Sequence, residues 1–112
     1  MSIFINRDPQ QQVKRQARVF PKNEKILAQL GENIKLARKR RGYSQQQICE
    51  RSGLSRVTIR NIESGSASVS MGHYVTMLAQ LGLVDDLLKV AADDKLGRKL
   101  QDIKLLGGKI TG

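Results

Sequence analysis

The apolar positions of this chain recur every three or four residues from about residue 24 to residue 106, with polar residues between them. This period marks one face of an α-helix. Glycines and small hydroxyl residues divide the pattern into short segments, and these residue types are the ones that commonly begin and end helices. The pattern therefore predicts an all-α protein.

Residues 44–65 are predicted to form two short helices joined by a tight turn. Ser44 is a good N-cap, and Gln47 completes a capping box three residues later. Gly53 ends the first helix, since glycine adopts the left-handed conformation without a Cβ penalty. Ser55 begins the second helix after one intervening residue, and Gly65 ends it. So short a connection forces the helices to cross steeply, as in a helix-turn-helix.

Each helix of this pair has one apolar side. Ile48 and Cys49 are expected to face inward on the first helix, Leu54 to fill the turn, and Ile59 and Ile62 to face inward on the second. The opposite side of the second helix carries Arg56, Thr58, Arg60 and Asn61. A helix with a buried back and hydrogen-bonding side chains on its front is suited to lying in a groove.

A longer helix is expected before this pair, over residues 24–41, with Asn23 as its N-cap and Gly42 as its stop. Its apolar stripe consists of Ile26, Leu30, Ile34 and Ala37. This stripe predicts that the helix covers the back of the pair. Gly31 costs about 1 kcal/mol relative to alanine inside a helix, which indicates a frayed first half.

Three further helices are expected after the pair. Ser70 caps a helix over residues 71–81 that Gly82 ends, with a core stripe of Met71, Tyr74, Val75, Leu78 and Leu81. A fifth helix is expected from residue 85 to about residue 92. The tail has an amphipathic pattern in Leu96, Leu100, Ile103 and Leu106. An isolated helix this short is only marginally stable in water, so it must pack on its own core, on a second copy or on another protein.

The chain is thus divided into residues 1–22, an N-terminal basic arm, residues 23–92, a helical domain, and residues 93–112, an amphipathic tail. The arm is expected to be mobile and to add phosphate contacts, because a polar tract with few apolar groups cannot offset its ordering entropy. An alternative is that the β-prone run from Ile3 to Ile5 pairs as an edge strand with a second subunit or a protein partner.

Charge is unevenly distributed over the 112 residues. Residues 1–70 hold fourteen basic and five acidic side chains, whereas residues 71–112 hold six and five. The net charge of +10 therefore belongs mainly to the first two thirds, and it favours nucleic acid as partner, with an anionic membrane as the rival. No apolar run is long enough to span a bilayer, and the N-terminus does not have the order of a signal peptide. One cysteine, Cys49, fits a reducing cytoplasm.

The sequence contains no recognisable catalytic or metal-binding pattern. The Asp85–Asp86 and Asp93–Asp94 pairs are not accompanied by a nucleophile, a phosphate loop or a ligand set, so helix capping explains them better than acid–base chemistry. His73 is the only histidine, and one imidazole without partners makes no metal site. We therefore expect neither enzymatic activity nor a cofactor.

The stretch with a Ser44-Gln45 opening, Gly53 in the turn, a Ser55-x-x-Thr58-Ile59 start and a Glu63-Ser64-Gly65 ending resembles the Xre/Cro family of phage-repressor-like regulators. The similarity extends from about residue 30 to about residue 83. It implies a five-helix, lambda-repressor-like helix-turn-helix domain whose second motif helix enters the major groove of double-stranded DNA. It also implies a bacterial cytoplasmic protein associated with the nucleoid.

The resemblance assigns roles to individual residues. The base-contacting positions are Arg56, toward guanine, Asn61, toward adenine, and Val57, toward a thymine methyl. The positions that contact phosphate or read DNA shape are Gln45, Ser55, Thr58, Arg60, Arg38, Arg40 and Arg41. Arg38 also matches a position that pairs with Glu63, so its structural role is placed before its phosphate contact.

The run from Val69 through residues 83–88 to residues 96–102 resembles the antitoxins of Hip-type toxin-antitoxin pairs. This likeness implies a homodimer that represses its own operon at an inverted repeat and neutralises a HipA-like kinase toxin. Two alternatives remain. One is a stand-alone phage-type repressor whose C-terminal helix serves dimerisation, and the other is an accessory module that bridges proteins or RNA through a non-specific basic face.

Overall fold

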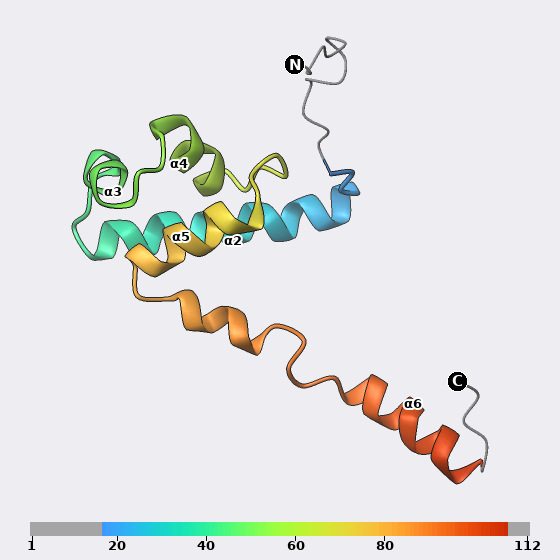
Figure 1. Cartoon of the computed structure of the whole chain (residues 1–112). Helices are drawn as coiled ribbons and strands as arrows, with labels where there is room; N and C mark the ends of the chain where they lie inside the picture. Colours follow the sequence, from blue (N-terminus) through green and yellow to red (C-terminus); the bar gives the residue numbers. More distant parts are fainter. Residues whose placement is uncertain (1–16, 108–112) are drawn as a thin grey trace, which may run out of the picture.

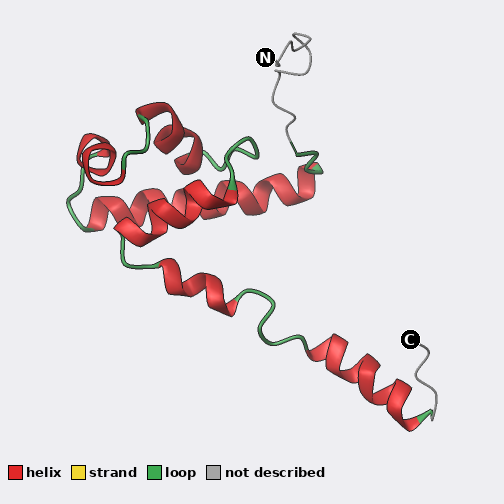
Figure 2. Ribbon diagram, in the orientation of Figure 1, coloured by secondary structure: helices red, strands yellow, loops and turns green. Residues whose placement is uncertain are grey.

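The computed structural model describes residues 17–107 of the chain. Within this part every regular element is helical (Figure 2): α2 Pro21–Arg40, α3 Gln45–Ser52, α4 Arg56–Glu63, α5 Met71–Gln80, η1 Val84–Lys89 and α6 Lys95–Leu106. The predicted all-α, lambda-repressor-like class is therefore confirmed. Residues 17–20 have no regular structure. The rest of the basic arm, including the run from Ile3 to Ile5 that was considered as an alternative edge strand, lies outside the described residues.

Helix α2 is the base on which the motif is built. Helix α4 packs on α2, α3 packs on both α4 and α5, and η1 packs on α5. Figure 1 shows α5 lying along α2, with α3 and α4 on the same side of α2. The apolar sides of four helices therefore meet in one core.

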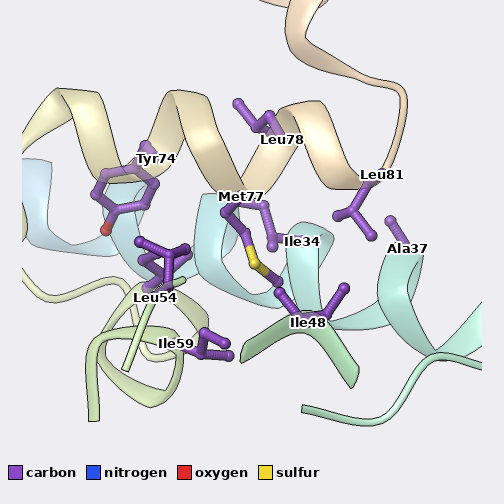
Figure 3. Close-up of a cluster of buried hydrophobic side chains, with 10 residues drawn as sticks. Ile34, Ala37, Ile48, Leu54, Ile59, Tyr74, Met77, Leu78 and Leu81 are labelled. Atoms are coloured by element: carbon purple, nitrogen blue, oxygen red, sulfur yellow. The ribbon is translucent and has the colours of Figure 1, made fainter. Parts of the chain in front are cut away.

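The core contains ten hydrophobic side chains, nine of which are labelled in Figure 3: Ile34, Ala37, Ile48, Leu54, Ile59, Ile62, Tyr74, Met77, Leu78 and Leu81. The inward positions predicted for the two motif helices are confirmed, with Cys49 partly buried against the cluster. On α5 the predicted stripe was partly wrong. Met71 and Val75 are exposed, whereas Met77 is fully buried and points toward Ile48.

Helix α2 begins earlier than predicted. Pro21 is its first residue, and the carbonyl oxygen of Phe20 accepts from the N–H groups of Asn23 and Glu24 at 2.8 and 2.9 Å. Asn23 is therefore inside the helix and is not its N-cap. Proline suits the first helical position because its fixed φ is already helical. Ile26 is 65% exposed and does not belong to the core, whereas Leu30 is partly buried against it.

Gly31 permits a close crossing and does not mark a frayed segment. A Cβ atom at this position would lie 2.6 Å from the backbone nitrogen of Gly65 and 2.7 Å from the carbonyl oxygens of Ile62 and Glu63. Gly65, at φ +75°, is equally crowded by the backbone of Leu27. These two glycines let the end of α4 rest directly on the backbone of α2, which is continuous through Gly31.

The fifth helix differs in type and extent from the expected α-helix over 85–92. The segment Val84–Lys89 is a 3₁₀-helix, with the N–H of Asp86 donating to the carbonyl of Leu83 at 3.1 Å. Val90 is extended and Ala91 has φ +62°, so the helical path ends there. Val84 and Leu87 of this segment pack on the core, whereas Leu88 and Val90 are exposed.

The tail forms the expected amphipathic helix. Asp94 caps α6 by accepting from the N–H of Gly97 at 2.9 Å, and the helix continues to Leu106. Figure 1 shows α6 extending away from the other helices. Its apolar side chains are exposed, so the helical period in the sequence did not predict burial within the described part of one chain.

Candidate nucleic-acid interface

The two motif helices are fixed by the predicted local chemistry. Ser44 Oγ accepts from the N–H of Gln47 at 3.0 Å, and Gln47 Oε1 accepts from the N–H of Ser44 at 2.8 Å, which completes the capping box. Gly53 takes φ +78°, and its N–H donates to Cys49. Ser55 then caps α4 by accepting from the N–H of Thr58 at 3.0 Å. The turn therefore presents the first residues of α4 at a defined angle to α3.

A buried ion pair ties α2 to the end of α4. Arg38 and Glu63 are 7% and 8% exposed, and Arg38 Nε lies 2.6 Å from Glu63 Oε2. Arg38 Nη2 donates to Glu63 Oε1 at 3.1 Å, and Nη1 donates to the carbonyl of Tyr43 at 2.8 Å. All three guanidinium nitrogens thus have partners within the protein. This burial removes Arg38 from the expected phosphate contacts.

A chain of hydrogen bonds leads from this pair to the surface. Gln45 Nε2 donates to Glu63 Oε1 at 3.1 Å, and Gln45 Oε1 accepts from Arg56 Nε at 3.1 Å. Arg56 Nη1 also donates to Gln46 Oε1 at 3.2 Å. The exposed arginine at the start of α4 is therefore braced against α3. Sequence reasoning missed this brace, because residues eleven positions apart carry no local signal of contact.

The outer face of α4 presents two neighbouring groups of side chains. Val57, which is 56% exposed, and Asn61 are one helical turn apart. With Thr58 they border a hollow of about 540 Å³ whose other wall includes Ser68, Ser70 and His73. Arg60 borders a second hollow of about 320 Å³ together with Lys35 and Gln45. Ser55 is exposed and donates its hydroxyl to Thr58 Oγ1 at 2.9 Å.

Hydrogen bonds hold the segment that lines one side of the first hollow. Tyr74, which follows His73 on α5, is buried, and its hydroxyl donates to the carbonyl of Ser66 at 3.1 Å. Burial raises the pKa of Tyr74 above its ordinary value of 10.0. Ser70, which caps α5 by accepting from the N–H of His73, also lines this wall. Its N-cap role was visible in the sequence, but its place beside α4 was not.

The cationic end of α2 divides into different environments. Arg40 is exposed, whereas Arg41 is exposed but folds back so that Nη1 donates to the carbonyl of Ala37 at 2.9 Å. Farther along, the guanidinium of Arg51 stacks over the ring of Tyr43 at 4.6 Å. Arg40 is consequently the least constrained of the three arginines predicted near the end of α2.

Within residues 17–107 no group of three His, Cys, Asp or Glu side chains has the arrangement of a metal site. None of the helices in this part of the chain has the length and apolar character needed to cross a membrane.

The geometry agrees with a comparison against known families, in which residues 34–85 match the family model described as Helix-turn-helix. Residues 34–85 form a helix-turn-helix domain. The match covers the second half of α2, the whole of α3, α4 and α5, and the first residues of η1. It supports a DNA-binding transcriptional regulator and the resemblance to the Xre/Cro family. No curated protein matches the chain.

Proposed function

We propose that this protein is a sequence-specific transcriptional repressor that binds an inverted repeat upstream of its own gene as a homodimer. The observation that carries the proposal is the construction of α4. Ile59 and Ile62 are fully buried, Glu63 is held by Arg38, and the opposite face is open to solvent. An α-helix presented in this way fits the major groove of B-DNA.

In this proposal the base contacts come from Arg56, Val57 and Asn61. The guanidinium of Arg56 would donate to guanine O6 and N7. Its hydrogen bonds to Gln45 and Gln46 would fix its orientation in the free protein. Asn61 would pair with adenine N6 and N7, and Val57 would contact a thymine methyl. A braced arginine loses less side-chain entropy on binding than a free one, which favours a defined contact.

The phosphate contacts would come from residues around this face, namely Gln45, Ser55, Thr58, Arg60, Arg40 and Arg41. Such contacts set the orientation of the protein but carry no sequence information. Gln45 already donates one N–H to Glu63, and its second amide hydrogen would remain for a phosphate. Since one recognition helix covers few base pairs, two copies would read half-sites about 10 bp apart or a multiple of this spacing.

The test compares two arginine substitutions on two DNA fragments, one from upstream of the gene and one of scrambled sequence. Arg56→Ala should cost about 1–3 kcal/mol on the upstream fragment and much less on the scrambled one. Arg40→Ala, the matched control, should weaken binding to both fragments alike. It should also reduce the slope of the logarithm of the binding constant against the logarithm of the salt concentration by about 1. Equal effects of the two substitutions on both fragments would contradict the assignment of base contacts.

A second candidate function is that of an antitoxin that binds a HipA-like kinase toxin. Its support is the resemblance of residues 69–102 to Hip-type antitoxins, together with the exposure of Leu88 within this run, which leaves apolar surface for a protein partner. Co-expression with the adjacent open reading frame should then give a stable complex. If the product of the adjacent open reading frame does not co-purify with this protein, a stand-alone phage-type repressor explains the sequence better than an antitoxin.

A further inference from the structure

Helix α6 carries an apolar face that is open to solvent. Leu96, Leu100 and Ile103 are 67%, 52% and 59% exposed, although their spacing places them on one side of the helix. On the same helical spacing, Lys99 and Lys104 flank this face, and Leu105 lies on the opposite side. An isolated helix of 12 residues is marginal in water, so α6 needs a surface to cover this face.

The same chain has an apolar groove that such a helix would fit. The groove has a volume of about 230 Å³ and lies where α2, α5 and η1 meet. Its lining includes Leu30, Leu83, Leu87 and Val90, with Asp86 as its acidic residue. Asp85 is exposed beside Asp86, whose contact with Lys89 is a solvent-exposed one at 3.5 Å. A weak exposed pair of this kind leaves Asp86 able to accept another cation.

We propose that α6 of each copy occupies this groove on a second copy, so that two chains exchange their C-terminal helices about a two-fold axis. Apolar side chains of α6 would fill the groove, and Lys99 and Lys104 would meet its acidic rim, which consists of Asp86 with Asp85 beside it. Because the contact is reciprocal, every apolar group contributes twice toward the roughly 1,200–2,000 Å² that stable interfaces bury.

The connection between η1 and α6 supports exchange. Val90 is extended, and Ala91 has φ +62°, a left-handed conformation that a residue with a Cβ atom adopts at a cost. Asp94 already caps α6, so only residues 91–93 would remain for reversing the chain onto its own groove. Short connections under strain favour exchange of an element between copies.

Pairing of α6 with α6 of the second copy is a poorer solution. Lys99 and Lys104 flank the apolar face on its two sides, so a self-paired helix would place lysines against lysines. The helix also contains fewer than two full heptads, which is short for a coiled coil. The acidic rim of the groove removes this repulsion.

This inference deepens the proposed function and rests on it for the need to join two recognition helices. The first test measures the mass of the full chain in solution without DNA, by light scattering and sedimentation equilibrium. A dimer is expected. A failure of sequence-specific binding would leave this result intact, and a monomer that still binds its operator would overturn the exchange alone.

The second test introduces the same charge on the two sides of α6. Leu100→Glu should weaken the dimer roughly 100-fold, since a carboxylate would enter an apolar groove beside Asp86. Leu105→Glu, on the opposite side, should leave the dimer constant within about twofold. Both side chains are exposed in the single chain, so circular dichroism should show an intact domain. Equal loss with both variants, or no loss with Leu100→Glu, would overturn the proposal.

The third test reverses charges across the proposed contact. Asp86→Lys should weaken the dimer, as should Lys99→Glu combined with Lys104→Glu, and the chain carrying all three substitutions should regain it. Asp102→Lys, on the back of α6, is the matched control and should have little effect. A dimer that is insensitive to Asp86→Lys, or a triple variant no better than its parents, would contradict docking in the groove.

Discussion

The ion pair between Arg38 and Glu63 should be among the most sensitive points of the fold. Both side chains are more than nine-tenths buried, so removing one leaves the other charged group without its partner in the protein interior. Such a loss costs about 3–5 kcal/mol. Domains of this size are stable by about 5–15 kcal/mol, so Arg38→Met should remove a large part of the stability.

The double variant provides the sharper test. Replacing both partners with methionine removes both buried charges, and well-packed apolar substitutes for buried ion pairs are often neutral or better. The Arg38→Met, Glu63→Met chain should therefore be more stable than Arg38→Met alone, although Gln45 and the carbonyl of Tyr43 lose hydrogen bonds. Urea denaturation followed by circular dichroism measures the free energy of unfolding of the wild-type chain, of Arg38→Met, of Glu63→Met and of the double variant. A double variant destabilised by the sum of the two single substitutions would refute this reasoning.

Three further predictions concern local contacts. Gly31→Ala should destabilise the domain by about 2 kcal/mol or more in thermal unfolding, because its Cβ would meet backbone atoms of α4 at 2.6–2.7 Å, whereas Gly72→Ala, with only Ser70 Oγ nearby at 3.9 Å, should be neutral or stabilise by up to about 1 kcal/mol. Ser55→Ala should cost about 1 kcal/mol by removing the cap of α4, and no loss would exclude a role for that cap in stability. The raised pKa of Tyr74 means that the folded chain holds the phenolic proton more tightly than the unfolded chain. The contribution of this proton to the free energy of unfolding is therefore complete below pH 10.0 and declines as the pH rises further. Tyr74→Phe should flatten this decline in a profile of stability against pH, and an unchanged profile would contradict the assignment.

Local chemistry predicted the parts of this fold that local chemistry controls. Ser44, Ser55 and Ser70 cap their helices as expected, and Gly53 and Gly65 take positive φ angles. These features depend on a few neighbouring atoms, and the residue types alone indicate them.

Two errors are local, since α2 begins at Pro21 rather than after Asn23 and the segment Val84–Lys89 is a 3₁₀-helix. The other errors fall where distant parts of the chain meet. Gly31 was interpreted as a weak point of α2, but the backbone of α4 crosses it. Met71 and Met77 both fit a helical stripe, and only packing against Ile34 and Ile48 selects Met77. The brace between Arg56 and Gln45 likewise depends on how α3 and α4 cross, which no local pattern gives.

The proposed central role of the domain, reading a DNA sequence through α4, is tested most directly by titrating the wild-type protein against the fragment upstream of its gene and a scrambled fragment of equal length. The titration belongs at about 150 mM salt, where non-specific phosphate contacts are weakened. The proposed repressor should bind the upstream fragment at least about 1,000-fold more tightly. Equal, weak binding to both fragments would contradict sequence-specific repression and favour a bridging module with a non-specific basic face.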